Sequence, residues 1–141
     1  MKLQTPMAVT SAFDYMADLN HFADWDPGVK SVRQVEGTSP GPGSRYEVTI
    51  AAGRRDLTLT YVTTLYDPPS RIVVRAESGL LVSEDRITVT AEGPGSTVEY
   101  DANLALKRGL SVFDPLLGVV FRKVAGRAAS GLLARLDATR V

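Results

Sequence analysis

Hydrophobic positions near the start of the chain recur at spacings of three and four. This is the period of a helix with one buried face, and it is carried by Ala12, Phe13, Met16, Ala17 and Leu19. Thr5 is the expected N-cap, with Pro6 at the first helical position. A second short helix or helical turn is predicted over residues 20–25, and Asp26-Pro27-Gly28 ends it with a turn.

After Gly28 the period of the pattern becomes two. Alternating apolar and polar residues indicate antiparallel strands with one face in water. The alternation covers residues 45–50, 57–65, 72–76, 86–90 and 98–106. Turn-forming clusters stand between the strands at hairpin spacing, at residues 38–43, 53–54, 67–70, 78–79 and 93–95. The sequence predicts six strands after Gly28, and a strand stub at Leu3–Thr5 that Pro6 stops.

The last 30 residues return to a helical period. One apolar stripe consists of Phe113, Leu117, Val120, Phe121, Val124, Ala128, Leu132 and Leu136. Such a stripe is typical of a helix laid on a sheet. Ser111 and Asp114 are alternative caps for it. Its small residues, among them Gly118, Gly126 and Gly131, either leave room for a cavity or allow close helix–sheet contact.

The bulk composition is that of an ordinary globular protein and narrows the function classes. The 141 residues fit one domain, residues 1–141, and 44% of them are hydrophobic. Sixteen basic and 16 acidic residues give a net charge of zero, which argues against nucleic acid as the main partner. The chain has no cysteine, so disulfides and thiolate chemistry are excluded. Without an apolar membrane span or a secretory signal, a cytoplasmic setting is expected.

Four segments together resemble a known family: WDPGV at residues 25–29, GPGSRY at 41–46, PSR at 69–71, and FDPLLGVVFRKVAGRAASGLLARL at 113–136. The chain is similar to the polyketide cyclase/dehydrase branch of the START-like (SRPBCC) superfamily. The resemblance implies an α+β helix-grip fold of the START/Bet v 1 kind. A seven-stranded antiparallel sheet would wrap around a long C-terminal helix, with two short helices after strand 1 and a deep hydrophobic cavity.

Members of this family bind lipids, sterols, isoprenoids or polyketides, and a few catalyse aromatic ring closure or dehydration. The resemblance therefore implies binding of a hydrophobic small molecule in the cavity, without a cofactor. The alternative is a polyketide aromatase/cyclase or dehydratase that acts on a ligand held in the same cavity. A third interpretation is a regulatory module that contacts another protein. The family has no invariant catalytic residue to carry over.

The predicted cavity has a volume of the order of a few hundred Å³, the usual size of a ligand site. Its expected lining is Tyr46, Val48, Leu59, Tyr61, Val74, Ile87, Tyr100, Phe113, Leu117 and Val120. Long loops often gate binding sites. The Gly- and Pro-rich segment Thr38–Ser44 is therefore expected to border the mouth, together with Leu110–Phe113.

Asp85 and Tyr61 are the candidate acid–base groups. Asp85 shares the strand phase of Ile87 and Val89, so a regular strand would point it inward. There burial would raise the pKa of the carboxyl and make it a general-acid candidate. Alternatively, residues 83–85 form a turn or bulge and Asp85 lies in water. The inward hydroxyl of Tyr61 needs a partner, which is a backbone carbonyl or water in a core and a ligand oxygen in a cavity.

His21 and Trp25 each allow two interpretations. His21, the only histidine, would be the base of a Ser-His-Asp arrangement or an ordinary partly exposed side chain. Its spacing to Asp24 and Asp26 is only faintly that of metal ligands, so no metal site is predicted. Trp25 either covers the cavity mouth or anchors its short helix to the sheet.

The terminal helix is basic through Arg122, Lys123, Arg127, Arg135 and Arg140. A solvated face and favourable interaction with the helix dipole explain these charges. A docking patch for an acidic carrier protein or an anionic membrane surface is the alternative.

Overall fold

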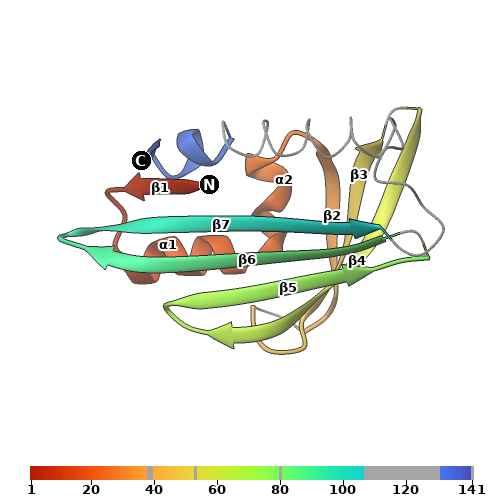
Figure 1. Ribbon diagram of the computed structural model, residues 1–141, viewed down its shortest axis with the longest axis horizontal. Helices are drawn as coiled ribbons and strands as arrows, with labels where there is room; N and C mark the ends of the chain where they lie inside the picture. Colours follow the sequence, from red (N-terminus) through yellow and green to blue (C-terminus); the bar gives the residue numbers. More distant parts are fainter. Residues whose placement is uncertain (38–39, 53, 80, 107–130, 141) are drawn as a thin grey trace.

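The computed structural model describes residues 1–37, 40–52, 54–79, 81–106 and 131–140. In chain order its elements are β1 (Lys2–Thr5), α1 (Val9–Ala17), the 3₁₀ helix η1 (Leu19–His21), α2 (Phe22–Trp25), β2 (Val29–Glu36), β3 (Arg45–Ala52), β4 (Arg55–Asp67), β5 (Arg71–Glu77), β6 (Leu81–Glu92), β7 (Gly95–Leu106) and β8 (Thr139–Arg140) (Figure 1). Residues 131–135 are helical as well.

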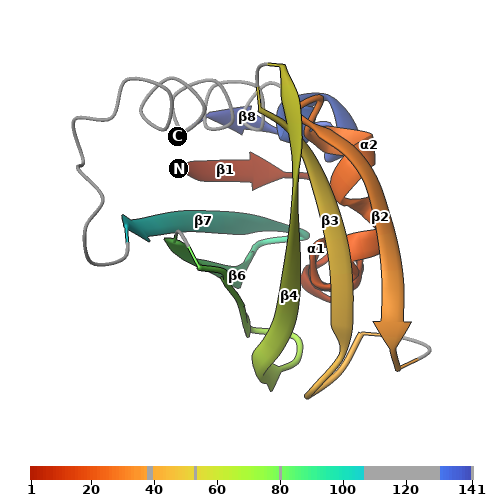
Figure 2. The same cartoon turned by 90° about the vertical axis from the view of Figure 1, so that its right-hand side faces the viewer.

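The strands form one antiparallel sheet in the order β2-β3-β4-β5-β6-β7-β1-β8. The predicted helix-grip sheet is confirmed: seven strands, six of them after Gly28, with the two-residue β8 added at one edge. Strands β2, β3 and β4 run across the direction of β7 and β1, so the sheet is strongly curved (Figure 2). The curvature follows from hairpin-linked strands that each twist relative to the last.

The predicted strand stub at the start of the chain lies inside the sheet. All four residues of β1 pair with β7, from Lys2 opposite Glu99 to Thr5 opposite Ser96, and β8 pairs with its other side. The approach is so close that a Cβ on Gly95 would lie 2.3 Å from the carbonyl oxygen of Thr5. A glycine is therefore required where β7 begins.

The predicted N-cap was wrong. Thr5 ends β1, residues 6–7 form a bend, and α1 begins at Val9 without a side-chain cap. Thr5 is held by the sheet because β7 pairs with it. Its hydroxyl donates to the carbonyl oxygen of Leu136 and accepts from the backbone N–H of Met7. Thr5 thus joins the first strand to the end of the terminal helix.

The second predicted helix and its turn are present. η1 and α2 together cover residues 19–25, and the carboxylate of Asp18 caps η1 by accepting from the backbone N–H of Asn20. In the turn that follows, the Asp26 carboxylate accepts from the backbone N–H of Gly28 at 2.8 Å. This hydrogen bond is the local turn chemistry expected of an Asp before Pro-Gly.

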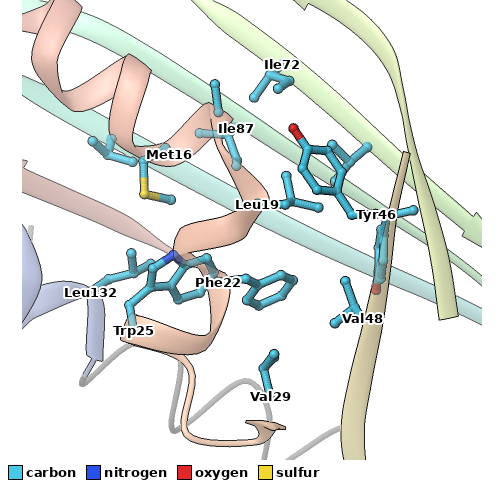
Figure 3. Packing of buried hydrophobic residues seen from close by; sticks show 14 of the residues in the cluster. Met16, Leu19, Phe22, Trp25, Val29, Tyr46, Val48, Ile72, Ile87 and Leu132 are labelled. Carbon is cyan, nitrogen blue, oxygen red and sulfur yellow. The ribbon is translucent and has the colours of Figure 1, made fainter. Parts of the chain in front are cut away.

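The core lies between the concave face of the sheet and the N-terminal helices. α1 packs against β6 and β7, and α2 packs against β2. Every residue of the predicted α1 stripe is buried, as are Leu132 and Leu136 of the terminal stripe. Phe22 and Trp25 lie side by side, with Leu132 beside Trp25 (Figure 3). The other residues of the terminal stripe lie outside the described residues.

Gly131 shows what one of the small residues in the terminal segment does. A Cβ at this position would lie 1.5 Å from the carbonyl oxygen of Trp25. The helical residues 131–135 therefore approach the end of α2 at a distance that only glycine permits. At Gly131 the small residue allows close contact, and the contact is with α2 and not with the sheet. Gly118 and Gly126 lie outside the described residues.

Candidate functional site

A pocket opens between the segment from α1 to α2 and the inner face of β5, β6 and β7. It is lined by Met16, Asp18, Leu19, Phe22, Trp25, Val74, Asp85, Ile87 and Tyr100. The empty space between these side chains measures about 260 Å³ with its open mouth included, while the centre of a water molecule has only about 10 Å³ in which to move. A space of that smaller size is at the lower limit for holding a single water molecule. A larger ligand therefore requires the lining to move.

The predicted lining divides into three groups. Val74, Ile87 and Tyr100 line the pocket. Tyr46, Val48, Leu59 and Tyr61 are buried in the core and do not line it. Phe113, Leu117 and Val120 lie outside the described residues, so the cavity expected along them stays a prediction.

Apart from Trp25 at the mouth, sequence reasoning missed the contribution of the N-terminal helices to this pocket. Met16, Asp18, Leu19, Phe22 and Trp25 form one of its walls. The helical stripe that predicted burial of Met16 and Leu19 was the available signal. The helix-grip fold predicts a cavity between the sheet and the terminal helix, whereas this pocket lies between the sheet and the N-terminal helices.

Asp85 is the carboxyl group at the sheet side of the pocket. It lies in the regular part of β6, opposite Val74 of β5 and Ala102 of β7, and is 4% exposed. The alternative that residues 83–85 form a turn in water was wrong, because β6 begins at Leu81. The Oδ2 atom of Asp85 accepts a hydrogen bond of 2.8 Å from the Tyr100 hydroxyl.

Burial raises the pKa of Asp85 to about 6, from an ordinary 3.8. Hydrogen bonds from Tyr100 and Ser83 oppose the rise, and the negative charges of Asp26 and Glu84 add to it. Burial acts in this direction because a low-dielectric surrounding disfavours the charged form. The carboxyl therefore changes its protonation state close to neutral pH.

Tyr61 belongs to the same polar group, although it does not line the pocket. Its hydroxyl donates to the Ser83 hydroxyl oxygen at 3.0 Å. Ala76 of β5 pairs with Tyr61 on one side and with Ser83 on the other. The Tyr61 side chain therefore reaches across the small side chain of Ala76 to Ser83. Burial, and next the charge of Asp85, raise the pKa of Tyr61 and of Tyr100 far above the ordinary value. Both phenols thus stay protonated and act as hydrogen-bond donors.

Aromatic rings form the helix side of the pocket. Phe22 stacks on Trp25 with ring centroids 4.7 Å apart, and Trp25 and Tyr100 meet in a T-shaped arrangement with ring centroids 5.7 Å apart. Phe22 and Tyr61 form a second T-shaped pair, with ring centroids 6.4 Å apart. Trp25 thereby anchors α2 to the sheet, as one of its two interpretations held, and it also lines the pocket. That it covers the mouth stays a prediction.

The chain matches the model of the polyketide cyclase/dehydrase and lipid transport family over residues 4–139. The chain belongs to the polyketide cyclase/dehydrase family. The resemblance seen in the sequence is confirmed. No curated protein sequence matches the chain significantly.

Solved structures show the same fold at low sequence identity. The Zhui aromatase/cyclase from a Streptomyces species has a TM-score of 0.75 at 13% identity, with 97% of this chain and 91% of that chain covered. A START superfamily protein from Mycobacterium smegmatis has a TM-score of 0.71 at 14% identity, covering 97% and 94%. Major latex-like protein 151 from Panax ginseng has a TM-score of 0.68 at 9% identity, covering 96% and 94%.

His21 has a packing role in this family member. Its ring stacks on Tyr15 with centroids 4.4 Å apart, and its Nδ1 atom lies 3.0 Å from the Tyr15 carbonyl oxygen. It does not line the pocket that contains Asp85. These contacts hold η1 against α1. Among the residues that the structure describes, no group of three or more His, Asp or Glu side chains is placed to hold a metal ion.

Two further expectations stay predictions: that the loop Thr38–Ser44 borders the pocket mouth, and that the basic residues of the terminal helix form a docking patch. Residues 40–44 do not line the pocket, and the backbone N–H of Gly43 bonds to the carbonyl oxygen of Thr63. Thr38, Ser39 and Leu110–Phe113 lie outside the described residues, as do Arg122, Lys123 and Arg127. Arg135 donates to the carbonyl oxygen of Asp24 at 3.1 Å. In the described ranges no helix is long and apolar enough to cross a membrane.

Proposed function

We propose that the chain binds a hydrophobic small molecule, such as a lipid, an isoprenoid or a polyketide-like compound, in the pocket between α1–α2 and the sheet. The observation that carries this proposal is the lining: apolar and aromatic side chains around one buried carboxyl at the sheet. Ligand sites commonly combine apolar walls with a few placed polar groups. The family description, which includes lipid transport, supports the same function.

Binding would be driven by burial of apolar surface. Each methylene group moved from water into the pocket contributes about 0.8 kcal/mol. The lining must yield to admit a chain, and Met16 is suited to this because its unbranched side chain adapts its shape easily. Affinity should therefore rise with chain length until the available space is filled.

Trp25 provides the assay, since it is the only tryptophan and lines the pocket. The freshly purified protein is titrated with straight-chain alcohols of increasing length, below their aggregation limits, while its fluorescence is recorded. Saturable changes are expected, with the dissociation constant falling by up to about fourfold per added methylene. Native mass spectrometry of the same sample shows whether a hydrophobic compound remains bound after purification.

Two neighbouring valines of β5 give matched variants. Val74 lines the pocket, while Val73 lies on the other face of the strand. Val74→Phe fills the space and should weaken alcohol binding at least about tenfold, or 1.4 kcal/mol. Val73→Phe should leave binding unchanged, and circular dichroism checks that both variants fold. The proposal fails if no alcohol gives a saturable signal and no compound is bound in the mass spectrum.

One observation favours the second candidate, a cyclase or dehydratase: the buried Asp85 with Tyr100 hydrogen-bonded to it. In the dehydration of a β-hydroxy ketone, protonated Asp85 would give its proton to the departing hydroxyl and regain one from the α-carbon. Water is then the only other product. General acids of this kind contribute typically 10²–10⁴-fold to a rate.

The two candidates differ in what Asp85→Asn changes. In an enzyme, the variant should lose about 10²–10⁴-fold in turnover of a β-hydroxy ketone substrate while binding stays largely intact. In a binding protein, the same change should alter the affinity for a neutral ligand by only about 1 kcal/mol, and no water loss should be detected with either form. Product mass after incubation with the substrate distinguishes these outcomes.

A further inference from the structure

The pocket has an unusual balance of charge for an apolar site. Two of its lining residues are acidic, Asp85 from β6 and Asp18 from the segment between α1 and η1. No Lys, Arg or His is among the described residues that line it. Asp26 and Glu84 add further negative potential at Asp85. A ligand placed here meets a field that is negative on the sheet side.

The aromatic residues that line the pocket suit a cation. Trp25 meets Tyr100 edge-on and stacks on Phe22, and all three residues line the same pocket. Aromatic faces attract an ammonium group, most strongly when water is excluded. The hydroxyl hydrogen of Tyr100 is already donated to Asp85, so the Tyr100 oxygen is left as an acceptor toward the pocket.

We propose that the ligand of this pocket carries a protonated amine on a hydrophobic body, with the ammonium group held by Asp85 between the aromatic rings. This inference rests on the proposed binding function and names the ligand class. Asp85 is 4% exposed yet lines the pocket, so its carboxylate lies where a ligand head group would be shielded from water. A buried charge is costly unless it is paired, and an ammonium group is the partner that removes this cost.

The same arrangement disfavours anionic ligands. A fatty-acid carboxylate in this pocket would lie beside Asp85, and like charges in a water-poor site repel strongly. A neutral alcohol avoids the repulsion but gains only an ordinary hydrogen bond. The expected order of affinity is therefore amine, then alcohol, then carboxylate, for chains of equal length.

The test uses dodecylamine, dodecanol and dodecanoate at pH 7.5, each below its aggregation limit, with Trp25 fluorescence as the readout. Dodecylamine is expected to bind about tenfold more tightly than dodecanol, since hydrogen bonds to charged groups are stronger than neutral ones. Dodecanoate is expected to bind about tenfold more weakly than dodecanol. The three probes share one chain length, so the apolar contribution cancels.

Two variants assign the preference to one carboxylate. Asp85→Asn should remove the amine-over-alcohol preference, while the affinity for dodecanol changes by no more than about fivefold. Glu84→Gln is the matched control: it changes the adjacent carboxylate of β6, which lies on the other face of the strand and pairs with Arg86. This control should retain most of the preference for the amine, because the charge of Glu84 is the smallest of the effects on Asp85.

Each outcome separates the inference from the function on which it rests. If dodecanol binds but the amine binds no better, or dodecanoate binds best, the amine inference is overturned and the binding function stands. If the preference survives in Asp85→Asn, the assignment to Asp85 is overturned. If none of the three probes binds, the proposed function itself fails. The wild-type series alone decides the ligand class, even if Asp85→Asn does not fold.

Discussion

Replacing Asp85 with Asn should change how the stability of the protein depends on pH. The side chain keeps its shape, and the Asn oxygen still accepts from the Tyr100 hydroxyl. What it loses is a buried group whose pKa is about 6 in the folded protein, against an ordinary 3.8. In the wild type this difference couples folding to proton binding.

The sign follows from which state binds the proton more tightly. Between pH 3.8 and about 6 the folded protein holds a proton on Asp85 that the unfolded chain has released. The contribution of Asp85 to stability is therefore fully present below the unfolded pKa and is lost as the pH rises through the folded pKa. At 1.36 kcal/mol per pKa unit, a shift of about two units costs the folded state about 3 kcal/mol. About 2.5 kcal/mol of this cost develops as the pH rises from 4 to 7.5.

Urea denaturation at pH 4, 5, 6 and 7.5 measures this effect, with far-UV circular dichroism as the probe. Relative to the wild type, Asp85→Asn should gain about 2.5 kcal/mol of unfolding free energy from pH 4 to pH 7.5. Glu84→Gln, on the solvent side of the same strand, serves as the control and should show little of this gain, because the charge of Glu84 is the smallest of the effects on the pKa of Asp85. A constant difference between Asp85→Asn and the wild type at all four pH values would refute the argument that burial raises this pKa.

Two further substitutions test how the terminal segment is attached. Gly131→Ala should destabilise the protein by about 1–3 kcal/mol in urea denaturation, because the added Cβ would collide with the carbonyl oxygen of Trp25. Gly41→Ala is the control and should not destabilise it, since nothing lies within 4 Å of a Cβ at that position. Equal effects of the two changes would show that residues 131–135 move to accommodate the added methyl group. Thr5→Val should lower the free energy of unfolding by about 1–3 kcal/mol in the same assay, because the buried carbonyl oxygen of Leu136 loses the hydroxyl that donates to it. An unchanged stability would contradict the role of Thr5 in joining β1 to the end of the terminal helix.

Much of the fold could be predicted from the sequence because one face of its sheet is buried and the other lies in water, so that apolar and polar residues alternate along each strand. Alternation along Tyr46, Val48 and Ile50 follows directly from strand geometry, and all three residues are buried. The turns agree with the hairpin signals because Gly and Pro restrict the backbone locally. These features depend on neighbours along the chain, which the sequence displays.

The errors share a physical cause, since each depends on contacts between distant segments. Thr5 has the chemistry of an N-cap, but pairing with β7 makes it the end of a strand. The pocket wall from Met16 to Trp25 depends on how the first helices lie over β5–β7. The direction of Asp85 depended on where β6 begins, and strand boundaries are the least certain part of a sequence pattern. Because β6 starts at Leu81, Asp85 lies within the strand, and the strand phase places its side chain on the buried face.

The protonation state of Asp85 in the complex separates the two proposed functions. With a pKa of about 6, the ionised form exceeds the protonated form about tenfold at pH 7. An amine ligand favours the ionised form, lowers the pKa and releases a proton when it binds near pH 6. A ketone substrate that accepts a hydrogen bond from Asp85 favours the protonated form, so binding takes up a proton.

Titration calorimetry at pH 6 in two buffers of different ionisation enthalpy measures this exchange directly. Proton release with dodecylamine, absent in Asp85→Asn, is the result expected for amine binding. Proton uptake with a β-hydroxy ketone, also absent in the variant, is the result expected for a general acid. If neither ligand exchanges a proton, Asp85 does not contact the ligand, and its cost to the folded state has no counterpart in binding.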